Sequence, residues 1–97
     1  MDNVYYSPES FGLTVVAELS KEPDYDFDIT VVWEHTDGTR YWASDSGCSC
    51  PTPFENYRGL SDLHKLPDSL RELRLAVENM YGVDKADEIK FLSQVGA

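Results

Sequence analysis

Alternating apolar and polar positions predict three β-strands in the first half of the chain, at residues 13–20, 27–36 and 39–45. One face of the first strand carries Leu13, Val15, Ala17 and Leu19. One face of the second carries Phe27, Ile29, Val31 and Trp33. Because strands joined by short connections pair antiparallel, the pattern predicts a three-stranded antiparallel sheet.

The dipeptide Asp37-Gly38 marks a hairpin turn, since glycine accepts the positive φ that such turns require. Two registers are compatible with it. A two-residue turn places Trp33 opposite Trp42, whereas a three-residue turn with a bulge places Trp33 opposite Tyr41 and moves Trp42 to the other face. The second register is favoured, because it also pairs the acidic and basic residues that flank the turn.

The last third of the chain has helical spacing and predicts two helices, at about residues 67–81 and 85–95. Pro67 suits a first helical position, and Asp84 suits an N-cap. The apolar stripe of the first helix is Leu70, Leu73, Val77 and Met80, and that of the second is Ala86, Ile89, Leu92 and Val95. The order of elements predicts an α+β fold with both helices packed on one face of the sheet.

At 97 residues, the chain is expected to form a single domain over 1–97. Residues 1–12 are expected to form an irregular N-terminal arm with Tyr5, Tyr6 and Phe11, and residues 46–62 a long loop. The N-terminus has neither the basic start nor the apolar stretch of a signal peptide, and no apolar run could span a membrane. We therefore expect a cytoplasmic protein.

Eighteen acidic residues against eight basic ones give a net charge of −10. Direct nucleic-acid binding is excluded on this ground, because phosphate backbones need clustered Lys and Arg. A DNA mimic remains compatible with the charge, provided that its carboxylates spread over one surface.

Two cysteines, Cys48 and Cys50, lie in the predicted loop. Together with His35 and His64 they could bind zinc, but paired zinc ligands are usually separated by about two to four residues. No sequence signature of a cysteine nucleophile is present. The favoured interpretation is a pair of reduced thiols that anchor the loop together with Pro51, Pro53 and Phe54, and neither a metal nor another cofactor is predicted.

An acidic and aromatic stretch precedes the second strand and contains Asp24, Tyr25, Asp26 and Asp28. Such a stretch could meet a basic surface on a partner, and Tyr5 and Tyr6 could add interface contacts, since tyrosine is enriched in binding hot spots. Structural roles are the alternative. The acidic stretch could be a charged sheet edge that prevents aggregation, and the two tyrosines could pack across the sheet.

Two runs, Tyr25–Trp33 and Tyr41–Glu55, together with the opening Tyr6-Ser7-Pro8-Glu9, resemble a family of small uncharacterised proteins encoded by phages of actinobacteria. The resemblance brings no catalytic residue. It implies a non-enzymatic accessory protein, a monomer or homodimer, that binds and modulates a host protein. A DNA mimic that inhibits a host defence protein and a small metal- or thiol-dependent protein built on the cysteine loop are the alternatives.

Overall fold

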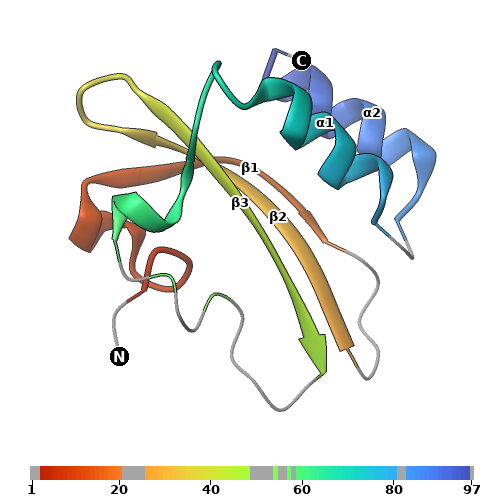
Figure 1. The fold of residues 1–97 in the computed structure, drawn as a ribbon, viewed down its shortest axis with the longest axis horizontal. Helices are drawn as coiled ribbons and strands as arrows, with labels where there is room; N and C mark the ends of the chain where they lie inside the picture. Colours follow the sequence, from red (N-terminus) through yellow and green to blue (C-terminus); the bar gives the residue numbers. More distant parts are fainter. Residues whose placement is uncertain are drawn as a thin grey trace.

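The computed structural model describes residues 3–20, 26–48, 54, 57, 59–80 and 83–96. Its strands are β1 (Leu13–Ser20), β2 (Asp26–His35), β3 (Arg40–Cys48) and β4 (His64–Lys65). Its α-helices are α1 (Leu70–Glu78) and α2 (Lys85–Gln94), and two short 3₁₀ helices are η1 (Pro8–Phe11) and η2 (Leu60–Asp62). The strands form one antiparallel sheet in the order β1-β2-β3-β4 (Figure 1).

The predicted α+β class and the antiparallel sheet are confirmed, but the sheet has four strands rather than three. The additional strand consists of His64 and Lys65, which lie opposite Trp42 and Tyr41. Two residues are too few to show an alternation, so the pattern could not reveal this strand. In addition, β3 continues to Cys48, so residues 46–48 belong to the sheet and not to the predicted loop.

The hairpin between β2 and β3 has the favoured register. Trp33 lies opposite Tyr41, Glu34 lies opposite Arg40, and Gly38 adopts a φ of 90°. The Arg40 Nε donates to the Glu34 Oε1 over 3.1 Å, so the charges that flank the turn do meet. This register places the two tryptophans of the hairpin on opposite faces of the sheet.

A β-bulge sends the two halves of β1 to different faces. The register against β2 shifts between Val15 and Ala17, which leaves Val16 as the extra residue. Leu13 therefore packs on one face, whereas Ala17 and Leu19 pack on the other. The prediction that the alternating apolar residues of this strand share one face was wrong, because one inserted residue inverts the alternation.

Both helices pack on one face of the sheet, called the helix face from here on, as predicted. Its buried residues come from β1, β2, β3 and both helices: Ala17, Leu19, Val32, Trp42, Leu73, Val77, Phe91 and Val95. The stripe of α1 is confirmed, with Leu73 and Val77 buried and Leu70 and Met80 packed at the margin. This helix is shorter than predicted at both ends. Residues 67–69 form a turn before it, so Pro67 is not its first residue, and it ends at Glu78 rather than at residue 81.

The predicted stripe of α2 is confirmed in part: Val95 is buried and Leu92 packs against the helix-face core, but Ala86 and Ile89 are exposed. Ile89 is 59% exposed, while Phe91 is buried together with Val95. Phe91 and Val95 are four residues apart and lie on the same side of the helix. The burial of the larger aromatic ring turns Ile89 toward solvent.

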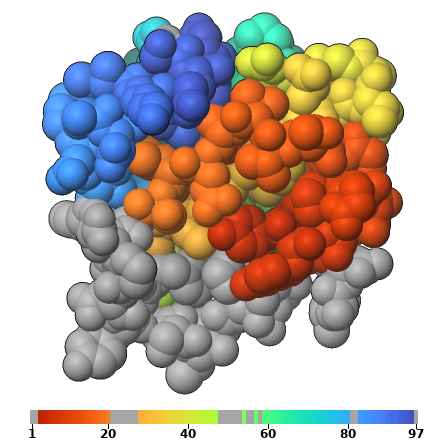
Figure 2. Space-filling model, turned by 180° about the vertical axis from the view of Figure 1, so that it is seen from behind, coloured from red at the N-terminus to blue at the C-terminus, as the bar shows by residue number. Residues whose placement is uncertain are grey.

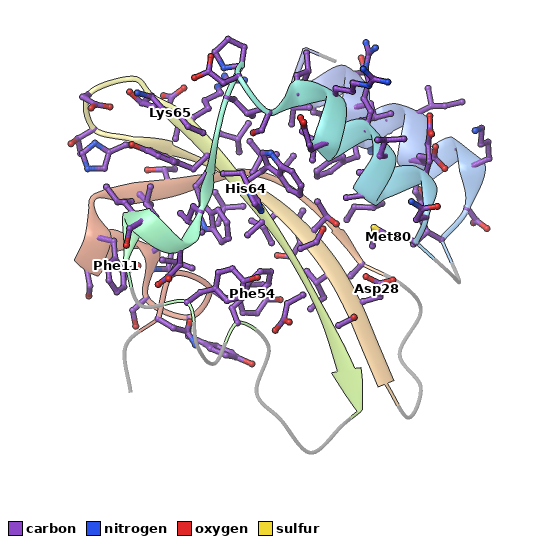
Figure 3. All side chains as sticks on the ribbon, viewed as in Figure 1. Phe11, Asp28, Phe54, His64, Lys65 and Met80 are labelled. Carbon is purple, nitrogen blue, oxygen red and sulfur yellow. The ribbon has the colours of Figure 1, made fainter. Side chains whose placement is uncertain are left out.

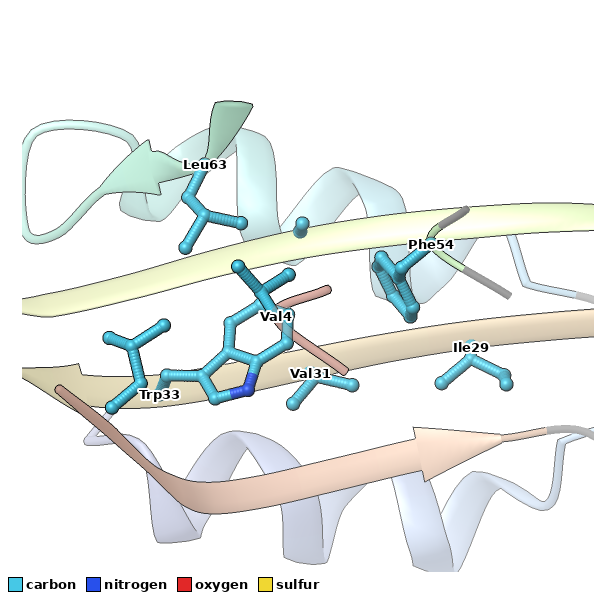
Figure 4. Close-up of a cluster of buried hydrophobic side chains, with 8 residues drawn as sticks. Val4, Ile29, Val31, Trp33, Phe54 and Leu63 are labelled. Carbon is cyan, nitrogen blue, oxygen red and sulfur yellow. The ribbon is translucent and has the colours of Figure 1, made fainter. Parts of the chain in front are cut away.

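The opposite face, called the arm face from here on, is covered by residues 3–12, by residues 59–63 and by Phe54 and Tyr57 (Figures 1 and 4). Its buried residues are Val4, Leu13, Ile29, Val31, Trp33, Ala43, Phe54 and Leu63. The predicted N-terminal arm thus contains η1 and forms a third layer on the sheet. Two hydrophobic cores result, one on each face.

Phe54 is the centre of the arm-face core. Its side chain is fully buried, stacked on Tyr5 with ring centroids 5.2 Å apart and in edge contact with Trp33 and Tyr57 at 5.8 and 5.1 Å. Its backbone adopts a left-handed φ of 58°, which is unfavourable for a residue with a side chain. The Phe54 N–H donates to the Asp45 Oδ2 over 2.7 Å, and this bond and the ring contacts hold the conformation.

On the helix face, Trp42 links the sheet to α1. Its Nε1–H donates to the Ser69 Oγ over 2.8 Å, and the Ser69 hydroxyl donates to the Lys65 carbonyl over 2.7 Å. The His64 ring packs on the Trp42 indole with centroids 4.5 Å apart. These contacts join β3, β4 and the start of α1.

Phe54→Ala should lower the free energy of unfolding by about 3–5 kcal/mol, because it removes a buried ring from three aromatic contacts. Leu75→Ala, on the exposed side of α1, is the control and should change it by no more than about 0.5 kcal/mol. Urea unfolding followed by circular dichroism measures both. Equal losses in the two variants would contradict a central role for Phe54.

Ser69→Ala should destabilise the protein by about 1–3 kcal/mol, because the buried Trp42 Nε1–H loses its acceptor. Ser69→Thr keeps the hydroxyl and should recover most of the loss. The same unfolding experiment tests the pair, and an alanine variant as stable as the wild type would show that this bond contributes nothing.

Candidate functional site

A groove of about 520 Å³ runs between β1 and α2 and is called the edge groove from here on. Its lining residues are Val15, Val16, Ala17, Glu18, Leu19, Ser20, Asp87, Lys90, Phe91 and Gln94. Figure 2 shows β1 (orange) at the surface between α2 (blue) and the N-terminal residues (red). Within the part of the chain that the structure describes, β1 has a neighbouring strand on one side alone.

The hydrogen bonds at the hairpin end show which backbone groups face which strand. The Thr36 N–H donates to the Gly12 carbonyl over 3.0 Å, and the His35 N–H donates to the Thr39 carbonyl over 2.8 Å. Along a strand of an antiparallel sheet, successive residues direct their N–H and C=O groups to opposite neighbouring strands. Every second residue from Thr36 back to Thr30 therefore directs its backbone groups toward β1.

The same alternation fixes the outer edge of β1. Leu19 lies opposite Thr30, so its backbone groups face β2. The neighbouring residues Glu18 and Ser20 therefore present their N–H and C=O groups away from β2, on the side of the edge groove. Both residues are exposed. The groove is thus bordered by backbone donors and acceptors at the spacing of a β-ladder.

The side chains of the edge groove form an apolar floor and a charged rim. Phe91 and Ala17 are buried beneath it, whereas Asp87 and Lys90 stand exposed on α2. Glu18 borders the groove from the strand side, but its carboxylate lies on the arm face, where it accepts the Tyr5 hydroxyl. Such a site can hold a short apolar side chain and favours a basic one beside it.

The arm connects to the groove through Tyr5. Its hydroxyl donates to the Glu18 Oε2 over 3.0 Å, and the Asn3 Oδ1 accepts the backbone N–H groups of Tyr5 and Tyr6 at 2.9 and 2.8 Å. Burial, and then the charge of Glu18, raise the pKa of Tyr5 to about 12. The phenol is therefore protonated at neutral pH and holds the Glu18 carboxylate on the arm face.

Those predicted partner-binding residues whose side chains the structure describes do not form one patch. Tyr5 and Tyr6 lie on the arm, with ring centroids 5.0 Å apart and Tyr6 54% exposed. Asp28 lies on the helix face opposite Ser46, on the same side of the strands as Met80, whereas Phe54 lies on the other side (Figure 3). Of the same set, Asp26 begins β2, and Asp24 and Tyr25 lie outside the described residues.

The predicted loop-anchor residues are described in part. Phe54 is buried in the arm-face core, and Cys48 ends β3 opposite Asp26. Cys50, Pro51 and Pro53 lie outside the described residues.

Three of the alternative zinc ligands lie in the described part of the chain, and they are far apart. Cys48 lies opposite Asp26 at one end of β2, and His35 lies at the other end, about 30 Å away at roughly 3.3 Å per residue. His64 packs on Trp42 on the helix face, whereas His35 is on the arm face. No three His, Cys, Asp or Glu side chains among residues 3–20, 26–47, 54, 57, 59–80 and 83–96 are placed to hold a metal ion.

A second, smaller groove of about 350 Å³ lies near the hairpin turn and includes Arg40 and Lys65. Its arginine already forms an ion pair with Glu34 at 3.1 Å. The edge groove is larger and is bordered by the outer edge of β1, which pairs with no further strand among the described residues, so it is the better candidate site.

Sequence reasoning missed the edge groove, although one signal for it was present. Val16 is an apolar residue at a polar position of the alternation, and this break marks the bulge. The contribution of α2 through Asp87 and Phe91 had no such signal, because it depends on which side of the helix meets β1.

No α-helix in the described ranges is both long and apolar enough to cross a bilayer. A family model with the description Domain of unknown function (DUF7574) matches residues 2–94. No curated protein and no solved structure matches the chain.

Tyr5 should titrate at about pH 12 in the folded protein and at about 10.0 in the unfolded chain. A raised pKa means that this contribution to stability is complete below pH 10 and is lost as the pH rises through about 12. Tyr5→Phe should therefore make the alkaline decline in stability shallower. Glu18→Gln should lower the pKa of Tyr5 only partway, since burial is the larger cause. Tyrosinate absorbance measures the titration in the wild type and in Tyr5→Phe. If the titration step that disappears in Tyr5→Phe is one at pH 10.0, the assignment of the raised pKa to Tyr5 is contradicted.

Proposed function

We propose that this chain, which belongs to the DUF7574 family, is a non-enzymatic module that binds a partner protein in the edge groove between β1 and α2. The observation that carries the proposal is the exposed edge of β1, with the outward backbone groups of Glu18 and Ser20 beside an apolar floor. Exposed sheet edges next to grooves recur as protein-recognition sites.

The opposite edge of the sheet is covered along the first half of β3, from Arg40 to Ser44. The carbonyl of Arg40 accepts the Leu66 N–H over 2.9 Å, and that of Ser44 accepts the Tyr57 hydroxyl over 3.2 Å. Between these two contacts, β4 pairs with Tyr41 and Trp42. Proteins commonly block sheet edges in this way, so the contrast with β1 supports a role for the open edge.

Charge supports a basic protein as the partner. The chain carries a net charge of −10, which speeds encounter with a positively charged surface and opposes approach to nucleic acid. The resemblance to phage-encoded proteins adds the expectation that the partner is a protein of the bacterial host, whose activity the binding modulates.

A DNA mimic is the weaker candidate. Mimicry needs carboxylates spread over one surface, but the exposed acids of this chain include Glu9 on η1 at the arm face and Glu72 on α1 at the helix face. Nothing in the described structure favours a phosphate-like row over a general negative charge.

Gln94→Trp tests the proposed groove. Gln94 is exposed on α2 and lines the groove, so the indole should fill part of it and abolish partner capture. Leu75→Trp adds the same ring on the exposed side of α1, away from the groove, and is the matched control. The measurement is affinity capture from host lysate at moderate salt, followed by mass spectrometry.

The expected result is a protein retained by the wild type and by Leu75→Trp but lost by Gln94→Trp. Retention by both variants would exclude the edge groove as the binding surface. Capture of many DNA-binding proteins that all dissociate as salt rises would support the mimic instead.

A further inference from the structure

We infer that the partner contributes an extended segment that adds to β1 as a fifth strand and places a lysine or arginine opposite Glu18. The inference rests on the proposed function and specifies how the groove is occupied. It follows from the direction of the backbone groups, the alternation of side chains and the charges at the rim.

The backbone argument concerns residues 17–20. Glu18 and Ser20 are two residues apart and direct their N–H and C=O groups into the edge groove. An added strand pairs with every second residue of an edge strand, so this spacing fits it. The bulge at Val16 interrupts the ladder on the N-terminal side. The added segment is therefore short.

The side-chain argument gives the chemistry of the segment. Ala17 and Leu19 belong to the helix-face core, so Glu18 points to the arm face, where it accepts the Tyr5 hydroxyl. A residue opposite Glu18 in the added strand lies on the same face, and opposite charges pair favourably there. Its two neighbours lie on the helix face.

The wall of the groove on the helix face is α2. The neighbours of the basic residue would lie beside Phe91, which is buried under the groove, and below the exposed Asp87 and Gln94. Small apolar residues suit this position, since the floor is apolar and the space is limited to about 520 Å³. The segment thus alternates basic and apolar residues.

A second copy of the chain is a poorer occupant. Antiparallel pairing of β1 with its own copy about a two-fold axis would bring two Glu18 carboxylates close together. Each copy also carries a net charge of −10. Like charges opposite one another destabilise a strand pair, so the same charges that attract a basic segment oppose self-pairing.

The probe is a short synthetic peptide in which lysine and valine alternate. Binding to the wild-type protein is measured by fluorescence anisotropy, and hydrogen exchange by NMR follows the amides of Glu18 and Ser20. We expect binding with protection of both amides. The same peptide with methyl groups on alternate backbone nitrogens, and a peptide with glutamate in place of lysine, should both bind about tenfold more weakly or worse.

Two variants separate backbone from charge. Glu18→Pro removes both the outward N–H and the carboxylate and leaves the bonds from β1 to β2 in place, so the protein should fold but bind the peptide about tenfold more weakly than Glu18→Gln, which lacks the carboxylate alone. Glu18→Gln keeps the N–H and should retain binding that is weaker and varies less with salt than that of the wild type. Circular dichroism checks the fold, and the methylated peptide supplies the same test on the unaltered chain.

Equal binding of the methylated peptide, or no binding of the lysine–valine peptide, would overturn the inference. Hydrogen exchange without peptide gives a further test. If the Glu18 and Ser20 amides are then protected, and the protection increases with protein concentration, the inference is overturned and the edge pairs with a second copy. If Gln94→Trp loses its captured partner while Glu18→Pro retains it, the groove binds a partner without strand addition. In that case the proposed function stands and this inference fails.

Discussion

The register of the β2–β3 hairpin is the constraint on which the rest of the structure depends. Pairing Trp33 with Tyr41 places Trp33 on the arm face and Trp42 on the helix face, so each large ring begins a separate core. Both faces of the hairpin are consequently apolar: Val31, Val32 and Trp33 are successive and all fully buried. A sheet that is apolar on both faces needs a layer on each side, and the two helices can cover only one. The arm and the segment around Phe54 supply the other.

The bulge in β1 adapts the edge strand to this three-layer arrangement. Without Val16 as an extra residue, the strand would present its apolar side chains to one core only. With it, Leu13 serves the arm-face core and Ala17 and Leu19 serve the helix-face core. The inversion also points the Glu18 side chain to the arm face and brings Ala17 below α2. The geometry of the edge groove is therefore a consequence of how the strand reaches both cores.

Local rules anticipated the parts of the fold that depend on neighbours in sequence. The hairpin register followed from a turn glycine and a flanking charge pair, and the α1 stripe followed from helical spacing at Leu73 and Val77. The parts that failed depend on distant contacts. β4 exists because two residues meet β3 after a long connection, and α2 buries Phe91 instead of Ile89 because of what lies opposite it. The candidate site combines β1 with α2, which are far apart in sequence, so no local pattern could place it.

An open edge strand is normally a hazard, because another chain can pair with it. In the described part of the chain β1 has an open edge, whereas β4, Leu66 and Tyr57 cover the first half of the β3 edge. Charge offers a way to keep such an edge both open and selective. Glu18 stands in the middle of the outward-facing segment, and a net charge of −10 repels other copies of the chain. Under the proposed function, the same field would attract a basic segment, so the charge that opposes self-pairing would also select the partner. An edge protected by charge rather than by a covering strand remains accessible to the one class of partner that neutralises it.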